Sequence, residues 1–197
     1  MNMTPTTKLE AVNIMLSTIG ESPVNSLSSG LVDAELAETI LENISKSVQG
    51  EGWHFNREEA FPVSPNVNGE IIVPTNTLRA DATLGHNSKD LIQRGTRMYD
   101  KREHTYNIGE TAKLDLIIEL DFTELPEVAR RYIAIKAARV FQDRVVGSDA
   151  LHGFTIQDEV AAYFQLKDFE TDTEDNNIMD NYSVFRVLDR TGYARSV

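Results

Sequence analysis

The sequence predicts an α+β fold made of a bundle of about four helices, a small β-rich insertion and an extended C-terminal arm. Apolar residues recur at helical spacing in the first fifty residues and again after residue 122. Between these regions the periodicity gives way to short β-prone runs separated by Pro, Gly and Asn. We therefore expect helical parts at 1–56 and 123–175, a β-rich insertion at 57–122, and an arm at 176–197.

The first two helices are indicated by their ends as well as by their apolar spacing. Thr4-Pro5 is typical of a helix start, and Gly20 is typical of a stop. The second helix is expected to end at Gly50 or Gly52, and its polar face carries acidic and basic side chains. Its apolar face is formed by Leu36, Ala37, Ile40, Leu41, Ile44 and Val48.

The insertion contains four runs that favour β-strands. They lie at 70–73, 90–94, 105–108 and 114–120, each bounded by residues that favour turns. A sheet of this size has marginal stability alone, so we expect it to lean on the helices.

A third helix is predicted over 126–146, with Pro126 opening it and Gly147 ending it. It carries two apolar stripes. The first contains Ile133, Ala137, Val140, Phe141 and Val145, and the second contains Val128, Tyr132, Ile135 and Val146. Two interpretations stay open: a helix central to its own bundle, or a helix shared with a neighbouring subunit. The second stripe supplies candidate subunit-interface residues.

A fourth helix is indicated by Ile156, Val160, Tyr163 and Phe164. The acidic run at 168–175 is interpreted as a solvated helix end. The arm that follows is rich in apolar side chains, which are rarely left exposed, so we predict that it binds a partner. Its candidate interface residues are Tyr182, Phe185 and Leu188.

Composition limits the classes of function. The formal net charge is −12, which disfavours a grip on nucleic-acid phosphates. The charge is uneven, with a net of +3 over 126–147 and −6 over 148–197, so complementary faces are expected. The chain has no cysteine, and no apolar run approaches the ~20 residues needed to span a bilayer. We expect no membrane association and no signal peptide.

No catalytic, cofactor or metal site is predicted. The four histidines, His54, His86, His104 and His152, share no metal-ligand spacing, and no nucleophile or phosphate-binding motif is present. With 31 acidic residues, paired carboxylates are no signal by themselves. The basic, aromatic stretch 94–102 is interleaved with acids and is interpreted as a self-neutralising loop or strand. These observations favour a non-enzymatic structural subunit.

Four stretches in order resemble the tail tubular protein A family of short-tailed, T7-like bacteriophages. They are an Ile-Gly-Glu-x-Pro-Val turn, a Gly-Trp-His-Phe-Asn segment, an Arg-Gly-x-Arg-Met-Tyr-Asp segment and a Phe-Thr-Glu-Leu-Pro-Glu helix start. Together they cover roughly residues 9–147. The family-motif positions in this sequence are Gly20, Pro23, Gly52, Trp53, Gly95, Tyr99, Asp100, Leu125 and Pro126.

The resemblance implies a structural adaptor that forms a twelve-fold homo-oligomeric ring in the virion tail, assembled in the host cytoplasm. Its implied partners are the portal protein, the tail nozzle (tubular B) protein and a tail fibre, and DNA passes through it without specific binding. Two alternatives stay open. One is a tail-associated hydrolase of cell-wall or capsule glycan, alone or as a side activity of the adaptor. The other is a monomeric binding module.

Overall fold

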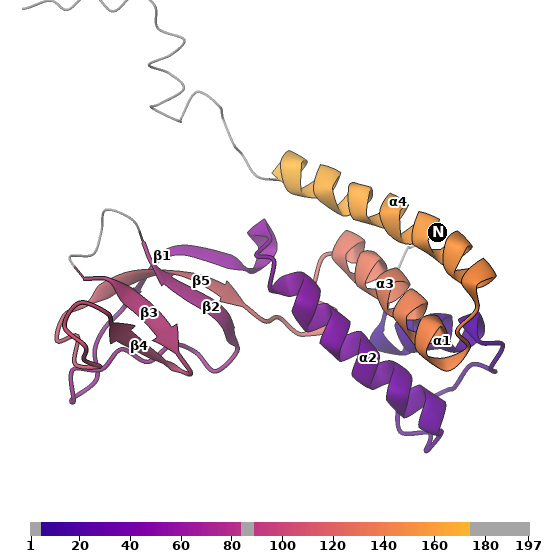
Figure 1. Ribbon diagram of the computed structural model, residues 1–197, viewed down its shortest axis with the longest axis horizontal. Helices are drawn as coiled ribbons and strands as arrows, with labels where there is room; N and C mark the ends of the chain where they lie inside the picture. The colour runs from indigo at the N-terminus through magenta and orange to yellow at the C-terminus, as the bar shows by residue number, and fades with distance from the viewer. Residues whose placement is uncertain (1–4, 84–88, 174–197) are drawn as a thin grey trace, which may run out of the picture.

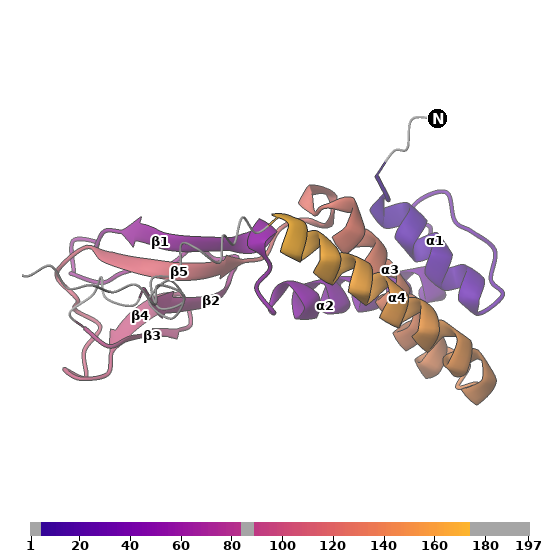
Figure 2. The ribbon, with the colours of Figure 1, turned by 90° about the horizontal axis from the view of Figure 1, so that it is seen from above.

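The computed structural model describes residues 5–83 and 89–173, and within them the chain is elongated, with helices at one end and a sheet at the other (Figures 1 and 2). This confirms a mixed α and β fold. The helices are α1 (Lys8–Thr18), α2 (Val32–Gln49), α3 (Glu127–Val145) and α4 (Asp149–Thr173). The strands are β1 (Arg57–Val63), β2 (Thr77–Ala82), β3 (Leu91–Arg94), β4 (Arg97–Asp100) and β5 (Ala112–Ile118). Short 3-10 turns, η1 (His54–Asn56) and η2 (Phe122–Glu124), occupy the two crossings between the halves.

Helix α3 is the centre of the bundle and contacts α1, α2 and α4. Its buried positions include several alanines, which let the neighbouring helices approach closely. They are Ala129, Tyr132, Ile133, Ala134, Ala137, Ala138, Phe141 and Gln142. The two-striped pattern of the sequence is thus explained, over most of the helix, by neighbours on several sides within one chain.

Helix α1 begins at Lys8, later than the predicted start at Thr4-Pro5. Thr7 is the N-cap, and its hydroxyl accepts a hydrogen bond from the N–H of Glu10 at 3.2 Å. In return the Glu10 carboxylate accepts one from the N–H of Thr7 at 2.7 Å. This reciprocal capping box satisfies two N–H groups at the start of α1, and it lowers the pKa of Glu10.

The sheet is antiparallel, with strand order β1-β5-β2-β3-β4. Two of the strand predictions were wrong. Segments 70–73 and 105–108 form only isolated bridges, Ile72 with Arg97 and Thr105 with Asp100. Strands β1, β2 and β4 were not predicted. β1 is an edge strand with exposed charges, a bulge at Ala60 and a proline, features that edges tolerate but that hide the apolar alternation.

The two halves have separate hydrophobic cores. The bundle core includes Met15, Leu41, Trp53, Ile133 and Phe141. The sheet core is formed by Ile71, Val73, Ala80, Leu91, Met98, Ile108, Ala112, Leu114 and Leu116. Each half therefore buries its own apolar surface, and the junction between them has to fix how they are oriented.

Candidate interaction surfaces

Trp53 is the centre of the junction between bundle and sheet. It follows the turn 50–52 at the end of α2, is 2% exposed, and its indole N–H donates to the backbone oxygen of Val48 at 2.8 Å. Tyr163 of α4 meets the indole edge-on, and the ammonium of Lys167 lies 4.3 Å from the ring centre. The single tryptophan therefore ties the end of α2 to the last turns of α4.

Two amide side chains complete this junction. Gln49 donates from Nε2 to the oxygen of Leu120 at 3.1 Å and accepts from the N–H of Leu120 at 2.8 Å. Asn56 donates to the backbone oxygens of Gln49 and Ile118, at 2.9 and 3.0 Å. The chain entering the sheet is thus bonded to the chain leaving it, which restricts hinge motion between the halves.

Gly52 makes the close approach possible. Its φ is +82°, and a Cβ placed there would lie 2.4 Å from Cδ1 of Ile117, a buried β5 residue. Glycine is the residue that tolerates both conditions. The Gly-Trp pair of the resemblance therefore has a structural explanation at this crossing.

Helix α4 is held at its C-terminal end by two hydrogen bonds between Glu170 and His54. The Glu170 carboxylate accepts the backbone N–H of His54 at 2.9 Å, and its other oxygen lies 2.5 Å from Nδ1 of the same residue. Both side chains are mostly shielded from solvent. The sequence interpretation of 168–175 as a solvated helix end is therefore wrong for Glu170, because helix packing brings one acid of the run onto η1.

The outer side of α4 carries an apolar stripe, which we call the α4 stripe. It consists of Ile156, Val160 and Phe164, which are 42%, 48% and 61% exposed. The sequence predicted the fourth helix from these residues and Tyr163, and the helix is confirmed. The helix packs on α3 through Ala162 and Leu166, while Arg139 of α3 pairs with Glu159. Apolar spacing locates a helix but does not say which stripe is covered when a helix has more than one.

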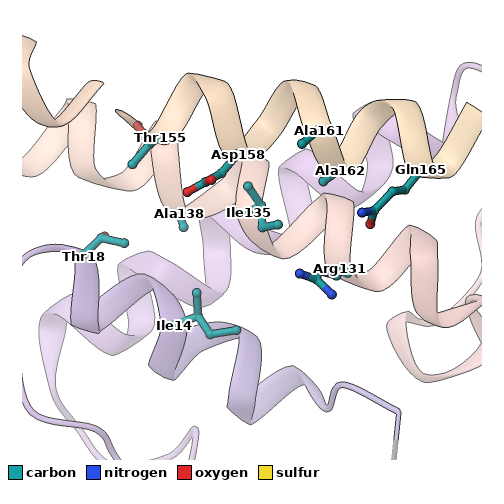
Figure 3. Close-up of a pocket in the computed structure, with 10 residues that line it drawn as sticks. All are labelled: Ile14, Thr18, Arg131, Ile135, Ala138, Thr155, Asp158, Ala161, Ala162 and Gln165. Atoms are coloured by element: carbon teal, nitrogen blue, oxygen red, sulfur yellow. The ribbon is translucent and has the colours of Figure 1, made fainter. Parts of the chain in front are cut away.

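A groove of about 330 Å³ lies on another side of α4 (Figure 3). We call it the bundle groove. Side chains of α3 lie between α1 and α4 in it, and its middle is formed by aliphatic and small residues with polar groups around them. Its lining is Ile14, Thr18, Arg131, Ile135, Ala138, Thr155, Asp158, Ala161, Ala162 and Gln165.

The candidate interface residues on α3 lie in different surroundings. Tyr132 is 4% exposed and packs on Tyr163, so it contributes to contacts within the chain. Ile135 lines the bundle groove, Val128 is half-buried, and Val146 is 48% exposed just beyond the helix end. Tyr182, Phe185 and Leu188, with the whole predicted arm 176–197, lie outside the described residues.

The remaining family-motif positions stabilise turns and helix starts. Gly20 has φ +82° and ends α1, and the exposed Pro23 precedes Val24, whose N–H and C=O both bond to Asn13. Gly95 has φ +64° in the two-residue turn between β3 and β4. Leu125 is buried below α3 and Pro126 is its N-cap.

Tyr99 and Asp100 lie on β4 at the far end of the sheet. Arg94 stacks over Tyr99 at 3.6 Å, Tyr99 meets Tyr106 at 4.9 Å, and Arg97 lies over Tyr106 and pairs with Glu70. Asp100 is buried and accepts the N–H groups of Arg102 and Glu103. The acid that pairs with Arg97 is therefore Glu70, which lies outside the stretch 94–102, and Asp100 bonds to backbone N–H groups and not to a basic side chain.

Hydrogen bonds lower the pKa of two carboxyl groups at helix starts. Backbone and hydroxyl groups of Thr7 lower the pKa of Glu10, and the contacts of Thr123 lower that of Asp121. No group of three or more potential metal ligands is found within residues 5–83 and 89–173. No helix in that part of the chain is long and apolar enough to cross a bilayer.

Sequence reasoning missed the polar residues that fix the junction. Gln49 and Asn56 are buried amides whose partners are distant backbone groups, and Glu170 pairs across 116 positions. A polar residue on an otherwise apolar helix face, as Gln49 is on α2, is the local signal that could have identified one of them.

Comparison with known proteins gives two matches. Residues 9–176 match the family model described as a tail tubular protein. The chain is also 33% identical, over 127 residues, to the tail tubular protein A of Klebsiella phage KP34. That alignment covers 64% of this chain and 67% of the phage protein.

Proposed function

The chain belongs to the tail tubular protein family, and from this premise we propose that it is the adaptor ring between the portal and the nozzle of a phage tail. Membership makes it a structural protein of the tail. The finer proposal is that copies assemble as a twelve-fold ring, bind the portal on one side and the nozzle protein on the other, and seat a tail fibre.

The observation that carries this proposal is the division of one chain into two ends with separate cores. An adaptor has to meet a different partner at each end. The end of the bundle away from the sheet, where α2 begins and α3 ends, exposes Val32, Val145 and Val146 (Figure 1). The sheet exposes Ile72, and Val67 beyond β1 is fully exposed. Exposed apolar side chains at both ends agree with a partner at each.

The junction gives the adaptor the stiffness that force transmission along a tail requires. Gln49 and Asn56 bond the chain that enters the sheet to the chain that leaves it, and Trp53 bonds back to the end of α2. Glu170 holds α4 on His54 at the same junction. Because each half is fixed relative to the other, copies can repeat with one geometry around a ring.

The excess of acidic residues supports a role as a channel through which DNA passes. A net charge of −12 repels the DNA backbone, so the genome can pass without being held. Replacing acids that line the lumen by lysine should slow ejection from purified virions, measured by dye release. Unchanged ejection kinetics would remove this part of the proposal.

The central test is the copy number that the full chain acquires on a portal ring. The purified chain should bind the portal protein of the same virus and reach a fixed twelve copies, measured by native mass spectrometry. The control is the nozzle protein, which should bind this complex but not the bare portal. Binding of a variable number of chains, or none, would reject the ring adaptor.

A further inference from the structure

We propose that the α4 stripe of one copy docks into the bundle groove of the next copy, and that this pair of surfaces is the repeated contact between subunits. The proposal rests on the proposed ring and deepens it by naming the two surfaces. The occupant of both is therefore a second copy of this chain.

The two surfaces lie on different sides of the same helix. At about 100° per residue, the groove residues Asp158, Ala161 and Gln165 are turned about 130° from the centre of the α4 stripe. A copy therefore presents the stripe in one direction and the groove in another. Contacts between unlike patches are heterologous, and they close into rings when the rotation between copies permits it.

The dimensions of the two surfaces agree. From Ile156 to Phe164 the stripe extends over about 12 Å of helix, at a rise of about 1.5 Å per residue. The α4 wall of the groove extends from Thr155 to Gln165, about 15 Å on the same basis. Three side chains on successive turns can therefore lie along the groove together.

The chemistry of the two surfaces also agrees. Phe164 is the most exposed member of the stripe, and aromatic side chains that fill pockets are typical anchors of protein interfaces. The groove offers Ile14, Ile135 and Ala138 as apolar contacts. Docking buries both apolar surfaces, neither of which is covered by another part of residues 5–83 and 89–173.

Charge gives the contact a direction. Arg131 lies at the Gln165 end of the groove, where α3 and α4 meet antiparallel (Figure 3). Among the described residues it makes no hydrogen bond or ion pair. Asp168 is exposed one turn beyond Phe164. If the symmetry axis of the ring is parallel to α4, the α4 helices of neighbouring copies are parallel to each other. In that arrangement Asp168 of one copy faces Arg131 of the next copy.

Two single variants test the surfaces separately. Phe164→Asp removes the anchor, and Ala161→Arg fills the groove. Both positions are exposed, so circular dichroism and the thermal midpoint should stay unchanged. Each variant should form portal-bound rings at about 30-fold lower affinity, the effect of removing an interface hot spot. Thr39→Asp, on the exposed side of α2, is the matched control. Rings of normal copy number and affinity from either variant would overturn the proposal.

A mixing experiment tests whether the contact is heterologous, and it does not depend on the portal. The chain has no cysteine, so introduced thiols are the only ones. Val160→Cys is combined with Ala161→Arg, which keeps Ile156 and Phe164 of the stripe. Ile14→Cys is combined with Phe164→Asp, which keeps the α3 and α4 residues of the groove. Each double variant alone should give no disulfide dimer under mild oxidation, and the mixture should give a mixed dimer.

Val67→Cys replacing Val160→Cys is the control for random collision. A mixed dimer that forms no faster than this control would overturn the proposal, and so would dimers formed equally by each double variant alone. If residues 174–197 of the same chain cover the stripe, the mixture should fail to cross-link, and the proposal is overturned. If the wild-type chain acquires no fixed copy number on the portal while the mixture cross-links, the ring adaptor fails and the docking surfaces stand.

Discussion

The carboxamide of Gln49 and the backbone of Leu120 bond in both directions, with Nε2 donating to the oxygen at 3.1 Å and the N–H donating to Oε1 at 2.8 Å. Asn13 makes the same reciprocal contact with Val24, at 3.0 and 2.8 Å. The Asn13–Val24 contact closes the turn after α1, and the Gln49–Leu120 contact closes the junction between bundle and sheet. In each, an amide fits because it carries both a donor and an acceptor.

Replacing Gln49 by Leu should destabilise the chain by about 1–3 kcal/mol, because both backbone groups of Leu120 lose their partner in a shielded place. Leucine keeps most of the volume, so the cost is mainly one of hydrogen bonding. The free energy of unfolding from urea titration measures it. Thr39→Ala, on the exposed side of α2, is the control and should change that free energy by less than about 0.5 kcal/mol.

Gly52→Ala should be more costly than Gly95→Ala. Both glycines have positive φ, so each substitution incurs backbone strain of about 1–2 kcal/mol. Only Gly52 adds a clash, with Cδ1 of Ile117 at 2.4 Å, whereas nothing lies within 4 Å of the added atom at Gly95. Overpacking of this kind adds about 1–3 kcal/mol. Equal thermal midpoints for the two variants would contradict the tight crossing.

Glu170→Ala should loosen the end of α4 without unfolding the chain. It removes both contacts with His54, so amide hydrogen exchange in residues 165–173 should become about tenfold faster, as a loss of about 1.4 kcal/mol implies. Glu170→Gln keeps an acceptor for the His54 N–H and should show a smaller effect. Asp172→Ala, on the exposed side, serves as the control, and equal acceleration in it would show that the contacts of Glu170 with His54 are not responsible.

Tyr132 should contribute to loss of stability at high pH. Burial raises the pKa of its phenol, and the hydrogen bond from Lys136 opposes that rise only in part. The pKa of Tyr132 in the folded chain lies above its unfolded value of about 10. The stability that Tyr132 contributes is therefore fully present below pH about 10 and is lost as pH rises through the pKa of the folded chain. Thermal midpoints between pH 8 and 11 should fall less steeply for Tyr132→Phe than for wild type.

The sequence by itself determined the class of fold, the existence of each helix, and the family resemblance. Apolar spacing is a local property of the chain, so Val32–Gln49 and Glu127–Val145 could be read from neighbouring residues. The motif glycines also act locally, through the sign of φ at a turn. Only the tertiary structure decided which side of α4 faces solvent, which acid of the last helix reaches His54, and which amides close the junction. These depend on contacts across as many as 116 positions, and no pattern among adjacent residues records where the chain returns.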